Sequence, residues 1–275
     1  MKPAQFDYVR AESVEEALDI LHQEGPDARV LAGGQTLLPM LNMRLARPRV
    51  VVDIMRLPGL NRIENIGGMI HVGAGVRQSE LERQAGLISR QPLLAAALPW
   101  IGHAQTRSRG TVCGSVAHAD PSAELPLVLV ALGGDIEMKS RRKSRRVPAE
   151  AFFTGMMATD RRDDELIEAV RFPAARAGTG YGFREIGRRH GDFAIVACAA
   201  VVDSRTAWLA VGGVADRPLA RELPLPDDAA LDEALDAFAW DLDARDDLHA
   251  TAAYRRQLVR RLGRETLEEA ARCRA

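Results

Sequence analysis

Short β-type runs and amphipathic helical patterns follow one another from the start of the chain, and this order limits the possible folds more than any other feature. A capping box at Ser13 and Glu16 predicts a helix that continues to Gly25. A β-type run at 29–31 then meets a pair of glycines, after which a second helical pattern spans 36–45. Helices and strands are therefore expected together, which is the pattern of an α+β chain.

Two breaks divide the patterns into three parts. The turn Leu57-Pro58-Gly59 separates a first lobe, residues 1–57, from a second, residues 58–175. A linker-like run at 174–180 leads into a third part, residues 176–275. Strand patterns lie at 50–54, 62–66, 69–72, 135–139, 165–172, 181–186, 194–202 and 206–211. Helical patterns lie at 126–132, 231–238 and 254–271, and a second capping box, Ser79 with Glu82, is expected to open another helix.

Composition is that of an ordinary globular protein and excludes several classes of function. The 275 residues are 47% hydrophobic and 27% charged, which suffices for about two domains with sizeable cores. Lys plus Arg total 37 and Asp plus Glu total 38, so no overall field attracts nucleic acid or anionic lipid. The basic run 139–146 has no aromatic residues between its charges, and we interpret it as a solvated hairpin loop.

Neither export nor metal binding is predicted for this chain. Its first ten residues carry charges without the apolar core of a signal peptide, and later apolar stretches are too short or too interrupted for a membrane span. Cys113, Cys198 and Cys273 are odd in number and far apart, which argues against a disulfide framework and against a metal cluster held by this chain alone. We therefore expect a cytoplasmic protein.

The first segment suited to a ligand is Ala32-Gly33-Gly34-Gln35-Thr36-Leu37-Leu38-Pro39. Its glycines can adopt positive φ and bring backbone N–H groups close to a ligand, and the helix that follows adds a partial positive charge. A diphosphate fits this arrangement. The segment has neither the Lys of a P-loop nor the spacing of G-x-G-x-x-G, so nucleotide hydrolysis and a Rossmann cofactor are not supported.

A second segment, residues 101–126, is dense in small and hydroxyl side chains. Gly110 and Gly114 permit close approach, and Thr111 and Ser115 can donate hydrogen bonds. Such a run suits a loop that wraps a flat, polar cofactor.

Three motifs in order carry a resemblance to a known family: AGGQTLLP at 32–39, RGTVCGSVAHADPSAELP at 109–126 and GFREIGRRHGDFA at 182–194. They resemble the medium FAD-binding subunits of the xanthine dehydrogenase and carbon monoxide dehydrogenase family of molybdenum hydroxylases, over nearly the whole chain. The resemblance implies an α+β fold with a two-lobed FAD-binding domain of the vanillyl-alcohol-oxidase (PCMH) type. A small α+β C-terminal domain, similar to that of the carbon monoxide dehydrogenase flavoprotein, is implied to follow.

The resemblance also implies which residues contact FAD. The diphosphate falls on the turn formed by Ala32, Gly33, Gly34, Gln35 and Thr36, with Leu37 adjoining. A second wall consists of Ile101, Gly102, Gly110, Thr111, Gly114, Ser115 and His118, with Glu124 where many relatives have a contacting Asp. Leu166 and Ile167 fall near an apolar contact with the ring system, and Arg184 aligns with a Lys of some relatives.

Cys113, Glu124 and Arg184 depart from the family's pattern. Cys113 replaces the first Gly of a G-G pair, so its φ must suit a side chain; we interpret it as a packed small residue because no resolving cysteine is near in sequence. Glu124 is one methylene longer than Asp, and Arg184 has a donor geometry unlike that of Lys. Either Asp120 or Glu124 is expected to cap a helix that begins near Pro126.

Two other interpretations concern histidines. His103 and His118 suggest a covalent flavin link, but the resembled family binds FAD noncovalently, and we favour hydrogen bonds to backbone. His190 with Asp192 is compatible with an acid–base pair and equally with a turn closed by Asp192. We expect no catalytic residue on this chain.

The function implied by the resemblance is electron transfer through FAD. A small subunit with [2Fe-2S] centres and a large molybdopterin-binding subunit are the implied partners in a heterotrimer, and the terminal electron acceptor is left open among NAD, oxygen, a quinone or a carrier protein. Two alternatives remain. One is a free-standing flavin oxidase, against which the short C-terminal part argues, and the other is a structural subunit that has lost FAD.

Overall fold

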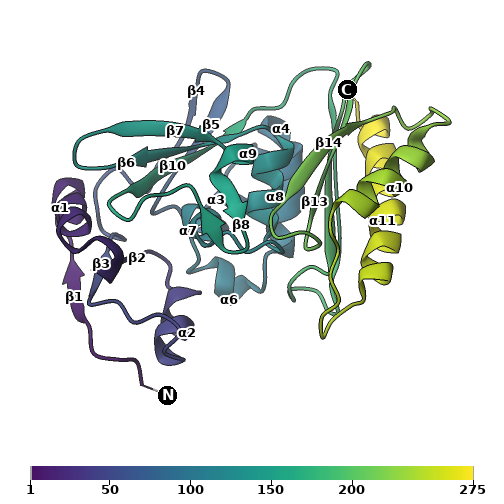
Figure 1. Ribbon diagram of the computed structural model, residues 1–275. Coiled ribbons are helices and arrows are strands. Elements are labelled where there is room, and N and C mark those ends of the chain that lie inside the picture. Colours follow the sequence, from purple (N-terminus) through teal and green to yellow (C-terminus); the bar gives the residue numbers. More distant parts are fainter. Residues whose placement is uncertain (1, 275) are drawn as a thin grey trace.

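The computed structural model describes residues 2–274 and arranges them as three parts side by side (Figure 1). The first lobe has a three-stranded sheet of order β1-β3-β2 in which both pairings are parallel. Its strands are β1 (Asp7–Arg10), β2 (Ala28–Leu31) and β3 (Val50–Asp53), and its helices are α1 (Val14–Glu24) and α2 (Leu37–Asn42).

Both helices of this lobe end where the backbone turns left-handed. The predicted cap of α1 is confirmed, since Ser13 Oγ accepts the N–H of Glu16 at 3.0 Å and Gly25 ends the helix with φ 52°. The carboxylate of Glu16 accepts from Glu12 at 2.7 Å and not from Ser13. Helix α2 is shorter than predicted, because Arg44 already has φ 58°.

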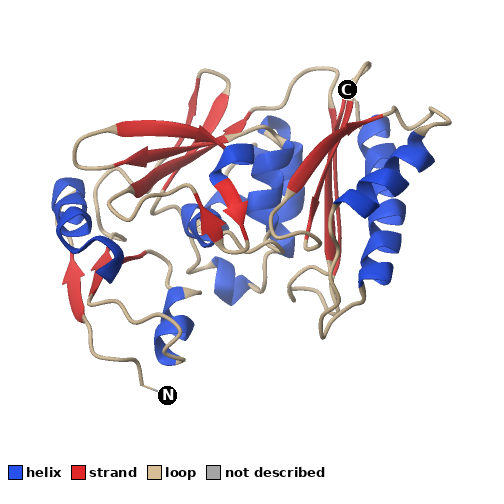
Figure 2. Ribbon diagram, viewed as in Figure 1, coloured by secondary structure: helices blue, strands red, loops and turns tan. Residues whose placement is uncertain are grey.

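The second lobe is built on a five-stranded antiparallel sheet of order β4-β5-β10-β6-β7. Apolar side chains on one face of this sheet, among them Val72, Ile136 and Val170, pack in the core, and Figure 2 shows short helices gathered between this sheet and the C-terminal one. The strands are β4 (Ile63–Ile66), β5 (Met69–Gly73), β6 (Asp135–Lys139), β7 (Ser144–Pro148) and β10 (Leu166–Pro173), beside a small hairpin of β8 (Phe153–Gly155) and β9 (Ala158–Thr159). The helices are α3 (Gln78–Glu82), α4 (Leu87–Arg90), α5 (Pro92–Ala97), α6 (Ala104–Arg107), α7 (Val112–His118), α8 (Glu124–Ala131) and α9 (Ala149–Phe152).

Two expectations for this lobe are corrected. Helix α3 begins one residue earlier than the predicted cap: Glu80 accepts the N–H of Arg77 at 2.9 Å, so Ser79 lies inside the helix. The basic run is a loop only at 140–143, since its last residues belong to β7. Several of its cations are paired and not simply solvated, as Arg145 Nε lies 2.7 Å from a Glu165 oxygen.

The C-terminal part is an antiparallel sheet with its strands in chain order and two helices on its outer face (Figure 1). Its strands are β11 (Gly180–Ile186), β12 (Val196–Val202), β13 (Ala207–Gly212) and β14 (Leu219–Leu223), and its helices are α10 (Leu231–Asp241) and α11 (Ala252–Arg272). Strand β14 was not predicted. Tyr181 and Phe183 face the second lobe and join its core, while Gly180 and Gly182 lie close against α11.

Within residues 2–274, no helix combines the length and the apolar character needed to cross a membrane.

Candidate cofactor-binding site

A cavity of about 580 Å³ lies where the first lobe meets the second, and the loop between β11 and β12 closes part of its edge. It contains every residue that the sequence predicted for FAD except one. Those lining it are Ala32, Gly33, Gly34, Gln35, Thr36, Leu37, Ile101, Gly102, Gly110, Thr111, Gly114, Ser115, His118, Glu124, Leu166 and Ile167.

The two glycine-bearing loops meet at this cavity. A Cβ built on Gly33 would lie 2.2 Å from the carbonyl oxygen of Arg109 and 2.7 Å from Cα of Gly110, so the loops approach more closely than any side chain at position 33 allows. Gly34 has φ 70°, a conformation that side chains with a Cβ rarely adopt. Segments more than seventy residues apart in sequence therefore form one wall.

Helix α7 presents a polar face to the cavity. Thr111, Gly114, Ser115 and His118 follow the spacing i, i+3, i+4, i+7, which places them on one side of a helix. The Thr111 hydroxyl caps the helix by accepting the N–H of Gly114 at 3.1 Å. Hydroxyl, imidazole and backbone groups are therefore concentrated along one strip of the wall.

Cys113 is held as a packed side chain at the cavity wall. It lies within α7 and has no positive φ, its thiol donates to the carbonyl of Val72 at 3.3 Å, and only 3% of it is exposed. Burial raises the pKa of the thiol to about 12. The thiol is therefore protonated at neutral pH, in agreement with the interpretation of a non-redox residue.

Neither Asp120 nor Glu124 caps α8 as predicted. The helix begins at Glu124, its N-cap is Ala123, and Asp120 closes a local turn by accepting the N–H of Ser122 at 2.9 Å. Glu124 is 7% exposed and lines the cavity. Burial raises its pKa to about 7, and the charge of Asp120 acts in the same direction.

Arg184 does not reach the cavity, and this prediction is corrected. Its guanidinium lies 2.9 Å from Glu269 and 3.6 Å from Glu265, both on α11. Successive side chains of a strand point to opposite faces, so Phe183 and Glu185 face the second lobe while Arg184 faces away from it. Neither Phe183 nor Glu185 lines the cavity, so a shift of one residue along β11 would not restore the predicted contact.

Several lining residues were missed by the sequence analysis. Gln78 is 5% exposed, and its Oε1 is buried without a hydrogen-bond partner. Arg161 donates to the carbonyl of Glu165 at 2.8 Å, and burial lowers its pKa. Phe193, in the β11–β12 loop, lines the cavity although 71% of it is exposed. Of these, only Phe193 lies within a motif that the sequence analysis singled out.

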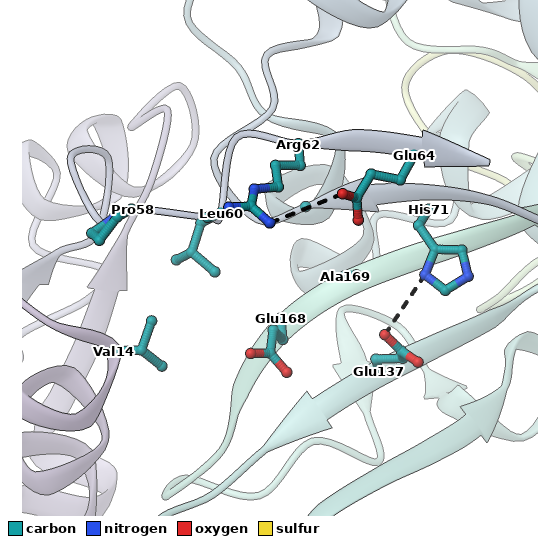
Figure 3. A pocket seen from close by; sticks show the side chains of 11 residues that line it. Val14, Pro58, Leu60, Arg62, Glu64, His71, Glu137, Glu168 and Ala169 are labelled. Atoms are coloured by element: carbon teal, nitrogen blue, oxygen red, sulfur yellow. Dashed lines mark ion pairs between the residues drawn. The ribbon is translucent and has the colours of Figure 1, made fainter. Parts of the chain in front are cut away.

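A second, smaller hollow lies between α1 and the outer face of the five-stranded sheet (Figure 3). It contains His71 and three glutamates, but these already have partners: His71 Nδ1 lies 4.0 Å from Glu137, and Lys139 Nζ lies 3.8 Å from Glu168. Across the described residues, no group of three or more His, Cys, Asp or Glu side chains is arranged to hold a metal ion. The polar groups here are used in pairing within the sheet.

Comparison with known proteins agrees with this geometry. Residues 4–175 match the family described as the FAD binding domain in molybdopterin dehydrogenase, and residues 181–270 match the CO dehydrogenase flavoprotein C-terminal domain. Subunit alpha of the 6-hydroxypseudooxynicotine dehydrogenase complex of Paenarthrobacter nicotinovorans is 38% identical, with 98% of this chain and 96% of that one covered. The carbon monoxide dehydrogenase medium chain of Hydrogenophaga pseudoflava is 37% identical over 74% of this chain and 70% of that one.

A solved structure shows the same fold. It is a chain of carbon monoxide dehydrogenase from Hydrogenophaga pseudoflava, in a form that lacks the Mo-pyranopterin moiety of the molybdenum cofactor. The two chains superimpose with a TM-score of 0.92 at 32% identity, and the alignment covers 100% of this chain and 100% of that one. The predicted α+β architecture, an FAD-binding domain followed by a C-terminal domain of the flavoprotein type, is confirmed. The chain belongs to the family of FAD-binding oxidoreductase subunits of molybdopterin dehydrogenases.

Proposed function

We propose that this chain binds FAD in the cavity between its two lobes and relays electrons between [2Fe-2S] centres on a partner subunit and a terminal acceptor. The observation that carries the proposal is the meeting of the two glycine loops, with Gly33 against Arg109 and Gly110, at one wall of a single cavity. The proposed units are a first lobe of residues 1–57, a second of 58–175 and a C-terminal domain of 176–275. A cytoplasmic location is part of the proposal.

The residues present fit the cofactor. A volume of about 580 Å³ falls in the range of small-molecule sites. Backbone N–H groups at positions 33–36 suit the diphosphate, and apolar residues such as Leu166 and Ile167 suit a ring system. The unpartnered amide oxygen of Gln78 fits a ligand contact, because buried polar groups in folded proteins are almost always hydrogen-bonded.

In this role the chain's own residues position the cofactor and supply no acid–base step. FAD, when bound, supplies the chemistry of accepting electrons one at a time and releasing two together. The glycine loops hold the diphosphate, the polar face of α7 provides hydrogen-bond donors and acceptors, and the buried walls exclude water. The thiol of Cys113 is kept protonated and therefore takes no nucleophilic part.

The proposed partners are a large molybdopterin-binding subunit and a small subunit with [2Fe-2S] centres. Two findings support this arrangement. Relatives are named as subunits or medium chains of complexes, and the solved carbon monoxide dehydrogenase is described by the state of its molybdenum cofactor. Co-purification of the three gene products at a constant ratio is the expected result, and recovery of this chain alone from cells that express all three would contradict the assembly.

Cofactor binding is tested on the purified chain. We expect added FAD to give a protein-bound flavin spectrum and to raise the unfolding temperature, since a ligand at a hundred times its Kd stabilises the folded state by about 2.7 kcal/mol. A colourless protein whose unfolding temperature does not respond to FAD would contradict the proposal. Reduction of bound FAD by an organic substrate in the absence of partners would instead favour a free-standing oxidase.

A further inference from the structure

The tip of a short hairpin in the second lobe carries two adjacent methionines. Strands β8 and β9 pair antiparallel, and Met156 and Met157 form the turn between them. Their exposed fractions are nearly equal, at 57% for Met156 and 55% for Met157. Of the two, Met157 lines the cavity of about 580 Å³ and Met156 does not. The chain therefore offers two equally exposed thioethers, one of which borders the cofactor cavity.

The base of this hairpin is tied to the rest of the molecule. Arg217, in the loop between β13 and β14, donates to the carbonyl oxygen of Phe153 at 2.8 Å. The N–H of Asp160 donates to the carbonyl of Phe152 at 2.8 Å, and the carbonyl of Asp160 accepts from Arg145 Nη2 at 2.6 Å. These contacts hold both strands, so the tip is presented at a fixed place on the edge of the cavity.

The backbone at Met157 is left-handed, with φ 51°. A residue with a Cβ adopts this conformation only at a cost, whereas glycine adopts it freely. Residues held in such conformations cluster at active sites and ligand clamps. A thioether side chain is thus retained at a strained position of the turn, at the one of the two methionines that borders the cavity.

The chemistry of methionine suits both ligand contact and oxidation. Its sulfur is polarizable and packs favourably against aromatic rings, such as the two ring systems of FAD. A peroxide converts an accessible thioether to the sulfoxide, which is polar. In this step the sulfur attacks one oxygen of hydrogen peroxide, the O–O bond breaks and an S–O bond forms. The sulfur gives up two electrons, and the other oxygen leaves as water with both hydrogens.

We propose that Met157 is an oxidation site controlled by the cofactor: bound FAD shields its thioether from peroxide, and the sulfoxide formed in the empty chain weakens FAD binding. This inference rests on the proposed function, since it takes FAD to be the ligand of the cavity. It adds a chemical modification by which the chain loses its capacity to bind the cofactor. Met156, at the same turn, has no such effect.

Both halves of the proposal follow from the position of Met157 at the cavity. A ligand that fills the cavity covers the surface that Met157 turns toward it and keeps peroxide from that surface. A sulfoxide oxygen covered by an apolar ring loses water without gaining a hydrogen-bond donor. That loss corresponds to a dissociation constant for FAD roughly tenfold higher.

Shielding is tested on the full-length chain by treatment with hydrogen peroxide, with and without saturating FAD, and residue-resolved mass spectrometry. Without FAD we expect Met156 and Met157 to be oxidised at similar rates, because their exposed fractions are nearly equal. With FAD bound, oxidation of Met157 should be several-fold slower and that of Met156 unchanged. Equal rates for the two methionines in the presence of bound FAD would overturn the shielding. No variant is needed for this measurement.

The effect on binding is tested by measuring the dissociation constant of FAD before and after peroxide treatment of the cofactor-free chain. We expect a roughly tenfold increase in the unaltered chain, reversed by a methionine sulfoxide reductase. Met157→Leu, which keeps the side-chain volume without the sulfur, should show the same dissociation constant before and after treatment. Met156→Leu is the matched control and should lose affinity as the unaltered chain does.

An equal loss of affinity in Met157→Leu and in the unaltered chain would overturn the role of Met157. Oxidation elsewhere, for example at Met40, which also lines the cavity, would then be responsible. An untreated chain that binds no FAD would contradict the proposed function and this inference with it. Bound FAD that leaves Met157 as reactive as Met156 would contradict the inference alone.

Discussion

Replacing Gly33 with alanine inserts one methyl group where the two glycine loops touch. The new Cβ would lie 2.2 Å from the carbonyl oxygen of Arg109 and 2.7 Å from Cα of Gly110. Ordinary contacts between such atoms are about 3.5 Å, so the loops must separate by roughly 1 Å. Because both contacted atoms belong to the backbone, no side-chain rotation relieves the clash.

Separation of the two loops should lower both the affinity for FAD and the stability of the folded chain. Overpacking of this kind costs about 1–3 kcal/mol of stability. Groups that hold a ligand must stay within about 0.5 Å of their working positions, and a lost hydrogen bond to a charged group costs about 1.5–3 kcal/mol. A loss near 3 kcal/mol corresponds to a dissociation constant roughly 100-fold higher.

The assay is a titration of FAD into the purified cofactor-free chain, followed by flavin fluorescence, with urea unfolding measured separately in the absence of FAD. Gly155→Ala is the matched control, because a Cβ there would meet only Ala158 Cβ at 3.9 Å, an ordinary contact. We expect the control to bind FAD as the unaltered chain does. A Gly33→Ala chain whose dissociation constant stays within about threefold of the unaltered value would refute the claim that this contact shapes the FAD site.

Three further substitutions or modifications have defined outcomes. Burial raises the pKa of Glu185 to about 8, above an unfolded value of about 4.3, so its contribution to the free energy of unfolding is greatest at low pH and is lost as pH rises to about 8. In Glu185→Gln this loss, on the order of 5 kcal/mol, should be absent from urea unfolding measured across that range; equal pH dependence in both chains would contradict it. Cys113, with a pKa raised to about 12, should resist iodoacetamide in the folded chain while exposed Cys273 reacts, and mass spectrometry that finds equal labelling would disprove the packing. Arg184→Gln should cost at most about 1 kcal/mol, because its ion pairs with α11 are partly exposed, and should leave FAD affinity unchanged; a clear loss of affinity would place Arg184 at the site after all.

Local sequence patterns predicted those helices and strands whose ends are determined by residues close by in the sequence. The cap at Ser13, the strand β6 and the helix α11 all follow from periodicity and capping within a few residues. Strand β14 was missed because it is half-exposed and contains two adjacent charged residues, Arg221 and Glu222. Its composition is therefore that of a loop. Its strand conformation comes from pairing with β13, which is a tertiary contact.

The candidate site shows the same division. The sequence analysis expected a loop across residues 101–126, where the structure has α6 and α7, so the polar face of α7 was not predicted. The closeness of Gly33 to Arg109 could not be predicted from sequence either, because it depends on how two lobes pack. For Arg184 and Glu185, which are adjacent in sequence, the resemblance identified the motif but not the phase of the strand. Only the observed register shows which of the two side chains faces the second lobe.

The division of the chain at 175 separates two pieces that share one core. Tyr181 and Phe183 belong to the same cluster of buried side chains as Leu127 of α8, and the β11–β12 loop supplies Phe193 to the cavity. Ending the chain at residue 175 would expose the apolar side of α8 to water, at about 25 cal/mol for each Å² uncovered. We therefore expect a 1–175 fragment to bind a hydrophobic dye, to aggregate and to show no saturable FAD binding in the assay used for Gly33→Ala. A soluble monomeric fragment with full affinity for FAD would show that the C-terminal sheet is not needed to complete the site.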